Sequence, residues 1–147
     1  MIWHDGLPDL ARANAFGADS MAGHLGIEFT AVGDDWIAAR MPVNAGTMQP
    51  YGRLHGGASV ALAETLGSVA GAMTVDPAHF AAVGLEINAN HVRPAGAGWV
   101  TATARPEARG RSTQVWSIRI EDEAGKLVCI SRFTVAIIPR DRGAPAT

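Results

Sequence analysis

Apolar and polar positions alternate with different periods along the chain, and the changes of period predict both helices and strands. The predicted elements are a short helix at 8–17 with Pro8 in its first turn, two strands between 25 and 43 around a turn at Asp34-Asp35, a loop at 44–54, a long helix at 55–75, and four strands at 80–92, 99–108, 112–121 and 126–138. Short connections between the last four strands favour antiparallel pairing. The order indicates an α+β fold in which a sheet wraps the long helix.

Alternation within the late strands predicts which side chains share a face. In strand 80–92 the apolar face would be Val83, Leu85, Ile87 and Ala89, and the polar face Glu86, Asn88 and Asn90. In strand 112–121 the shared apolar face would be Trp116, Ile118 and Ile120. The single cysteine, Cys129, is expected to be a buried thiol in the last strand. We expect residues 1–138 to form one domain and the polar, Pro/Gly-rich residues 139–147 to form a flexible tail.

The composition is that of one soluble globular domain. The chain has 147 residues, of which 48% are hydrophobic and 18% charged, and its formal net charge is −2. Without a basic excess, neither a nucleic acid nor a membrane surface is the expected partner. One cysteine allows no intrachain disulfide and fits a cytoplasmic location, and the N-terminus shows no signal-peptide pattern. The longest apolar stretch, at 58–73, is interrupted by Glu64 and does not predict a membrane span.

Several kinds of site have no pattern in this sequence. The histidine, cysteine and acidic residues lack metal-ligand spacing, so we expect no metal, and no cofactor. A serine nucleophile elbow, a phosphate loop and a dinucleotide fingerprint are also absent. His4, His24 and His79 are expected at the surface, and the four tryptophans are expected to be packing residues.

The long predicted helix carries one formally charged side chain, Glu64, between His55 and Val75. Its other positions are nearly all apolar, which indicates a buried helix. A carboxylate there is costly unless it is paired or solvated. It could form a salt bridge with an arginine at a wet edge, or it could line an apolar pocket as a nucleophile or general base. Ser68, four residues on, shares its face and could hold the carboxylate or a water.

The same helix opens with His55-Gly56-Gly57. Backbone N–H groups in a first turn lack intrahelical partners and carry the positive end of the dipole, so glycines there would let a ligand oxygen approach. The alternative is a tight connection from the loop into the helix. His55 and Glu64 are nine residues apart, which is about 13 Å along the axis and about half a turn around it. If both act on one carbonyl, they must come from two subunits.

Four segments carry a family resemblance: residues 49–59 (QPYGRLHGGAS), 63–71 (AETLGSVAG), 83–93 (VGLEINANHVR) and 114–116 (QVW). Together they resemble the hotdog-fold, PaaI-like acyl-CoA thioesterases, in the branch of the Arthrobacter-type 4-hydroxybenzoyl-CoA and bacterial 1,4-dihydroxy-2-naphthoyl-CoA thioesterases. The resemblance covers about residues 1–138. It implies a long central helix wrapped by a curved antiparallel sheet, a homodimer whose two sheets join and whose active sites straddle the interface, and dimers that pair into tetramers.

By position, the resemblance also implies the residues of the reaction. Glu64 matches the family's catalytic carboxylate, acting as nucleophile or general base, and the Gly56 N–H matches the group that polarises the thioester oxygen. Gln49 and His55 match side chains that position or polarise the substrate, and Ser68 matches a helper near the carboxylate.

The residues implied in CoA binding form three groups: Gly84; His91, Val92, Arg93 and Pro94; and the turn of Ala108, Arg109, Gly110, Arg111, Ser112 and Thr113. Guanidinium groups suit phosphates, although each arginine could instead be a solvated surface charge. This chain has Arg111-Ser112-Thr113 where relatives place Ser-Arg-His, and Pro94 replaces a small polar residue. These departures suggest a different arginine geometry around the nucleotide.

Three functions are compatible with a hotdog fold, and the site residues discriminate among them. Glu64, His55 and Gln49 together favour a thioesterase acting on acyl-CoA, with aromatic acyl groups (hydroxybenzoyl, phenylacetyl or dihydroxynaphthoyl) preferred over other acyl groups. Thioesters on a carrier protein are an alternative substrate, as in proofreading of siderophore assembly. A non-catalytic acyl-thioester-binding module is a second alternative, and a hotdog dehydratase would need a different histidine motif.

Overall fold

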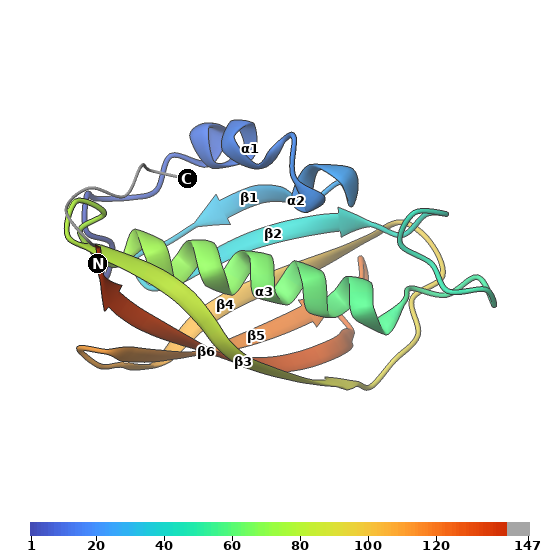
Figure 1. Cartoon of the computed structure of the whole chain (residues 1–147). Helices are drawn as coiled ribbons and strands as arrows, with labels where there is room; N and C mark the ends of the chain where they lie inside the picture. Colours follow the sequence, from blue (N-terminus) through green and yellow to red (C-terminus); the bar gives the residue numbers. More distant parts are fainter. Residues whose placement is uncertain (141–147) are drawn as a thin grey trace.

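The computed structural model describes residues 1–140, in which one antiparallel sheet curves around a long helix (Figure 1). The helices are α1 (Leu10–Gly17), α2 (Met21–His24) and α3 (Gly56–Met73), and the strands are β1 (Glu28–Val32), β2 (Ile37–Pro42), β3 (Phe80–His91), β4 (Trp99–Arg109), β5 (Thr113–Glu121) and β6 (Leu127–Pro139). The strand order in the sheet is β1-β2-β4-β5-β6-β3, and all pairs are antiparallel. The predicted α+β class and the wrapped central helix are confirmed.

Helix α3 packs against the concave face of the sheet and forms the core with it. Leu62, Leu66 and Ala70 are fully buried against sheet residues such as Trp116 and Phe133. His55 caps the helix, because its Nδ1 accepts from the Gly57 N–H at 2.8 Å. The predicted start at 55 is therefore the N-cap, and the predicted end at 75 lies one residue beyond the C-cap, Thr74.

A buried polar network holds the C-terminal end of α3 on the sheet. The indole N–H of Trp116 donates to Gln114 Oε1 at 3.0 Å, and Gln114 Nε2 donates to Thr74 Oγ1 at 2.7 Å. Thr74 Oγ1 in turn donates to the Gly71 carbonyl at 2.8 Å, at the last turn of the helix. Trp3 stacks on Trp116 with ring centroids 6.4 Å apart. These two tryptophans are packing residues, as predicted.

One prediction near the N-terminus needs correction, and one short element was missed. Pro8 precedes the helix, because Asp9 is the N-cap of α1 and accepts from the Arg12 N–H at 3.1 Å. The four-residue helix α2 was not predicted, since one turn is too short to show a helical period.

The predicted faces of β3 are wrong for its first half. Ile87 pairs with Phe133 and Gly84 with Val135, so both lie on the core side, while Val83 pairs with Ala136 on the outer side. The cause is a β-bulge between Gly84 and Glu86 that inserts Leu85 as an extra residue. A bulge shifts the alternation by one position. Val83 and Leu85 are consequently 45% and 59% exposed.

The last strand confirms the buried thiol and moves the predicted boundary of the tail. Cys129 is fully buried in β6. Pro139 still pairs with Phe80, and the Arg140 N–H donates to the His79 carbonyl at 2.9 Å. The remainder of the predicted tail, residues 141–147, lies outside the described residues. Within residues 1–140, no helix is long and apolar enough to cross a membrane.

Candidate active site

The loop before α3 holds Gln49 in a tight hairpin. The Gln49 N–H donates to the Arg53 carbonyl at 2.8 Å, and the Gly52 N–H donates to the Gln49 carbonyl at 3.0 Å. The Leu54 N–H, which donates to the Ala95 carbonyl at 2.7 Å, anchors the end of the hairpin. Gln49 Oε1 accepts from the Tyr51 N–H. Its Nε2 group is therefore the donor that it can offer to a ligand.

At the start of α3, His55 and Gly56 present hydrogen-bond donors. Because His55 Nδ1 accepts the Gly57 N–H, a neutral His55 ring carries its proton on Nε2, and this N–H can donate to a ligand. Gly56 is the first residue of α3, so its N–H belongs to the first turn that no helix carbonyl can satisfy. These donors could bind an oxyanion. The same geometry also provides the tight connection from the loop into the helix, which was the alternative interpretation of His55-Gly56-Gly57.

His91 lies directly against Gly56. The sequence did not predict this contact, because the two residues are far apart along the chain. A Cβ on Gly56 would come within 2.9 Å of His91 Nε2. His91 is the last residue of β3, and its neighbours Val92, Arg93 and Pro94 follow as exposed residues. The N–H groups of Val92 and Arg93 both donate to the Val128 carbonyl, which fixes this segment beside β6.

Glu64 lies halfway along α3, half-buried, with its carboxylate against β3. A Cβ on Gly84 would meet Glu64 Oε1 at 3.0 Å, so the missing side chain leaves the room that the carboxylate occupies. The alternative of a salt bridge is not seen, since no ion pair within residues 1–140 involves Glu64. Ser68 lies one turn further, also half-buried. The structure thus places the Glu64 carboxylate, which has no cationic partner among residues 1–140, between α3 and β3.

The turn between β4 and β5 lies on the Gly84 side of the molecule, away from His91. The Gly110 N–H donates to the Thr113 carbonyl at 2.8 Å, and Thr113 pairs with Ala136 on β6. His91 pairs with Cys129 instead, seven residues away along β6, which is about 23 Å. The turn residues are exposed, namely Ala108, Arg109, Gly110, Arg111, Ser112 and Thr113.

One protomer therefore divides the predicted residues into two groups. The helix-start group is Gln49, His55, Gly56, His91, Val92, Arg93 and Pro94, and the mid-helix group is Glu64, Ser68, Gly84 and residues 108–113. Gly56 and Glu64 are about 12 Å apart along the helix axis. Each group contains only some of the residues that the predicted reaction requires: the oxyanion donors are in the helix-start group and the carboxylate is in the mid-helix group. Among residues 1–140, no cluster of three His, Cys, Asp or Glu side chains could hold a metal ion.

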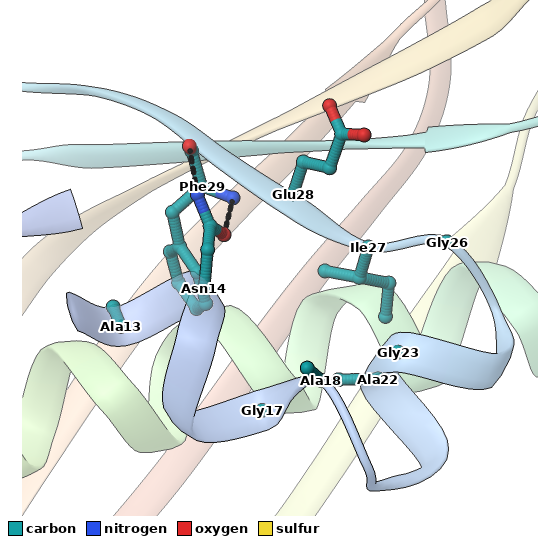
Figure 2. Close-up of a pocket in the computed structure, with 10 residues that line it drawn as sticks. All are labelled: Ala13, Asn14, Gly17, Ala18, Ala22, Gly23, Gly26, Ile27, Glu28 and Phe29. Carbon is teal, nitrogen blue, oxygen red and sulfur yellow. Dashed lines mark hydrogen bonds between the residues drawn. The ribbon is translucent and has the colours of Figure 1, made fainter. Parts of the chain in front are cut away.

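A cleft between α1, α2 and β1 lies apart from both groups (Figure 2). Its volume is about 250 Å³, and small side chains and backbone form most of its lining. The side chain of Asn14 pairs with the backbone of β1 as a neighbouring strand would: it donates to the Phe29 carbonyl at 3.1 Å and accepts from the Phe29 N–H at 2.8 Å. This pairing covers part of an exposed sheet edge. Its one carboxylate, Glu28, forms an ion pair with Arg40 at 2.8 Å.

Comparisons with known proteins identify the family. Residues 51–129 match the model of the thioesterase superfamily, and this match covers α3 and both groups in large part. The chain belongs to the thioesterase superfamily. A thioesterase of Pseudomonas aeruginosa superposes with a TM-score of 0.93 at 47% identity, over 95% of this chain and all of that one, which confirms the hotdog fold.

Two curated relatives of this thioesterase have specific names. The 1,4-dihydroxy-2-naphthoyl-CoA hydrolase of Escherichia coli is 50% identical over 138 residues, covering 94% of this chain and 100% of the relative. The proofreading thioesterase EntH of Cronobacter turicensis is 46% identical over 138 residues, covering 94% and 99%. The chain is accordingly an enzyme, a thioester hydrolase.

Proposed function

We propose that this hydrolase cleaves acyl-CoA thioesters, with aromatic acyl groups as its substrates, and that Glu64 is the reacting carboxylate. The observation that carries the proposal is the position of Glu64, whose carboxylate lies against Gly84 of β3. The similarity to a dihydroxynaphthoyl-CoA hydrolase supports the aromatic substrate class.

The chemistry requires a carboxylate and an oxyanion site. The thioester oxygen would accept from the Gly56 N–H, at the positive end of α3, with the Nε2–H groups of His55 and Gln49 as further donors. Glu64 would either attack the carbonyl carbon, forming an anhydride and releasing the CoA thiolate, or remove a proton from an attacking water. In both routes the C–S bond breaks and water supplies the atoms for the free acid. Ser68 would hold the carboxylate or the water.

The two groups of residues would meet across a homodimer. β3 is a sheet edge of twelve residues with exposed Val83 and Leu85, and long unpaired edges favour pairing with another strand. Antiparallel pairing of two β3 strands about an axis between Ile87 and Asn88 would bring Gly84 opposite His91 of the partner subunit. Since Glu64 contacts Gly84 and Gly56 contacts His91, this register assembles one complete site from two halves.

CoA would then be bound by both subunits. Arg93 would come from one chain and Arg109 and Arg111 from the other, where their exposed guanidinium groups could meet phosphates. Gly84, Val92, Pro94 and the backbone of the turn at 108–113 would complete the binding surface. We also propose that two such dimers pair into a tetramer.

An acyl or aryl thioester on a carrier protein is the second candidate substrate. The similarity to the proofreading thioesterase EntH favours it, and the phosphate-binding groups of the proposed site would serve a phosphopantetheine arm as well as CoA. A non-catalytic binding module is not supported, because the residues for the reaction are all present.

The test is thiol release from a panel of aliphatic and aromatic CoA and carrier-protein thioesters, with Glu64→Ala and Glu64→Asp assayed beside the wild type. We expect aromatic CoA thioesters to give the highest kcat/KM and Glu64→Ala to lose about a thousandfold or more, as removal of a reacting group does. Release from no thioester, or an unimpaired Glu64→Ala enzyme, would contradict the proposal. A higher kcat/KM for carrier-protein thioesters would select the second candidate.

Mixing of variant subunits tests the shared site. Glu64→Ala and His55→Ala homodimers should each be nearly inactive, whereas their heterodimers retain one intact site. We expect the mixture to recover activity towards about a quarter of the wild-type value, since random exchange makes half of the dimers heterodimers with one site of two. Failure to recover, when mass spectrometry shows that heterodimers have formed, would place both residues in one subunit's site.

A further inference from the structure

Arg53 lies in the hairpin before α3, and the proposed function gives it no role. Its backbone belongs to the site, because the Arg53 carbonyl accepts from the Gln49 N–H at 2.8 Å. The next residue, Leu54, donates its N–H to the Ala95 carbonyl at 2.7 Å, which joins the hairpin to the loop that follows β3. Arg53 is therefore fixed beside the helix-start group of residues.

The Arg53 side chain extends from the hairpin onto the same loop. A Cβ on Gly96 would come within 3.3 Å of Arg53 Nη1 and 3.7 Å of Arg53 Cζ. The missing side chain of Gly96 thus leaves the room that the guanidinium group occupies. Arg93 and Pro94, which precede Gly96 in this loop, are already part of the proposed CoA-binding surface. The Arg53 guanidinium consequently lies at the border of that surface.

Most hydrogen-bond donors of Arg53 are available to a ligand. Its Nη1 donates to the Gly52 carbonyl at 3.3 Å, which is a long bond. A guanidinium group has several N–H donors in a planar fork, and this fork matches the oxygens of a phosphate. The residue is exposed, and none of the ion pairs within residues 1–140 includes it.

Positive charge gathers around this loop. Arg93 is also exposed and has no ion pair within the described part of the chain. The first turn of α3 adds the positive end of the helix dipole. The carboxylate of Glu123 lies against Gly98 of the loop and accepts from the Trp99 N–H at 3.2 Å. Two guanidinium groups on one loop suit a ligand with several negative charges.

We infer that Arg53 binds a phosphate group of CoA, beside Arg93 of the same subunit. The inference rests on the proposed function in taking CoA thioesters as the substrates. It adds a link from the nucleotide to the reacting end. Because the Arg53 carbonyl holds the Gln49 N–H, a phosphate bound at Arg53 also steadies the hairpin that presents Gln49 to the thioester. Binding energy from a remote part of the substrate then contributes to kcat.

The test compares benzoyl-CoA with benzoyl-pantetheine, which has no phosphate, as substrates of the wild type and of Arg53→Gln. We expect Arg53→Gln to lose about tenfold or more in kcat/KM for benzoyl-CoA, through both kcat and KM, and to stay within about twofold for benzoyl-pantetheine. Arg53→Lys keeps the charge without the fork and should recover part of the loss. The matched control is Arg12→Gln, an equal change at an exposed position of α1, which should leave both substrates within about twofold.

Equal losses for both substrates in Arg53→Gln would show that the side chain only supports the hairpin, and would overturn the inference. Wild-type kcat/KM for benzoyl-CoA would overturn it as well. A loss confined to KM would support the phosphate contact and overturn the link to Gln49.

Calorimetry with CoA itself separates the inference from the proposed function, because binding of CoA needs no turnover. If Arg53→Gln loses about tenfold in affinity for CoA while the wild type releases no thiol from any thioester, the phosphate contact stands and the proposed reaction falls. If the wild type hydrolyses benzoyl-CoA and Arg53→Gln matches it in kcat/KM and in CoA affinity, the reaction stands and the inference falls.

Discussion

Gly84 of β3 lies against the carboxylate of Glu64, so close that a Cβ at position 84 would come within 3.0 Å of Glu64 Oε1. The same Cβ would come within 3.0 Å of the Phe133 ring, which is fully buried and cannot move away easily. The carboxylate would have to shift instead. The bulge of β3 begins at this bare stretch of backbone. The strand thus sets the position of a side chain on the helix.

Gly84→Ala should displace the Glu64 carboxylate and lower kcat. Displacement of a reacting group by about 1 Å can cost about a hundredfold in rate, and we expect a loss of about tenfold to a hundredfold. Steady-state kinetics with the best thioester of the panel measure it. Gly17→Ala is the control, because its Cβ would meet only ordinary contacts at 3.8 Å and should leave kcat unchanged. Wild-type kcat in Gly84→Ala would show that this contact does not position Glu64.

The contact between Gly56 and His91 predicts a suppressor. In Gly56→Ala the new methyl group would press on the His91 ring at 2.9 Å and disturb the first turn of α3, so kcat should fall. Removing the ring in His91→Ala opens that space. We expect the double variant to recover much of the kcat lost in Gly56→Ala, although its KM stays raised if His91 binds CoA. No recovery in this double-mutant cycle would mean that the methyl group acts on something other than His91.

The exposed edge of β3 predicts that charge there prevents assembly. Leu85 is the inserted residue of the bulge and is 59% exposed, so Leu85→Lys should leave the protomer folded while opposing β3–β3 pairing. We expect sedimentation to show a smaller species and thiol release to fall with it. Met21→Lys on α2, at a residue that is 66% exposed, is the control. An unchanged assembly with Leu85→Lys would place the subunit contact elsewhere.

The elements with a long, regular pattern could be predicted from sequence, and features that depend on a neighbouring element could not. The apolar surround of Glu64 and the alternation in β5 are visible in single segments. The bulge at Leu85 depends on the register with β6, so one strand's alternation gave Val83 the wrong face. Likewise the His91–Gly56 contact joins distant segments.

Part of the site was predictable for a similar reason. The nine-residue separation of His55 and Glu64 is fixed by helix geometry, so the division into two groups follows from sequence alone. The packing of the N-terminal segment on the end of α3 was not predictable, because the His4 N–H donates to the carbonyl of Met73, which is distant in the sequence.

The buried network beneath α3 predicts a stability loss. Gln114→Leu would leave the indole N–H of Trp116 without its acceptor and remove the donor to Thr74 Oγ1. We expect the free energy of unfolding to fall by about 1–3 kcal/mol, the cost of an unsatisfied buried polar group. Urea denaturation measures it. Thr101→Val, at an exposed position of β4, should change stability by about 0.5 kcal/mol or less, and a similar value for Gln114→Leu would show that the network contributes little.

Cys129 should be unreactive in the folded protein. The thiol is fully buried in β6, and burial raises its pKa, so both access and the fraction of thiolate are low at neutral pH. We expect an aryl disulfide reagent to modify the native chain only as fast as it unfolds, and one thiol per chain to react at once in denaturant. The Cys129→Ala chain should give no signal in either state. Rapid labelling of the native wild type would instead show that β6 opens, and it would add a protein thiol to every thiol-release measurement of activity.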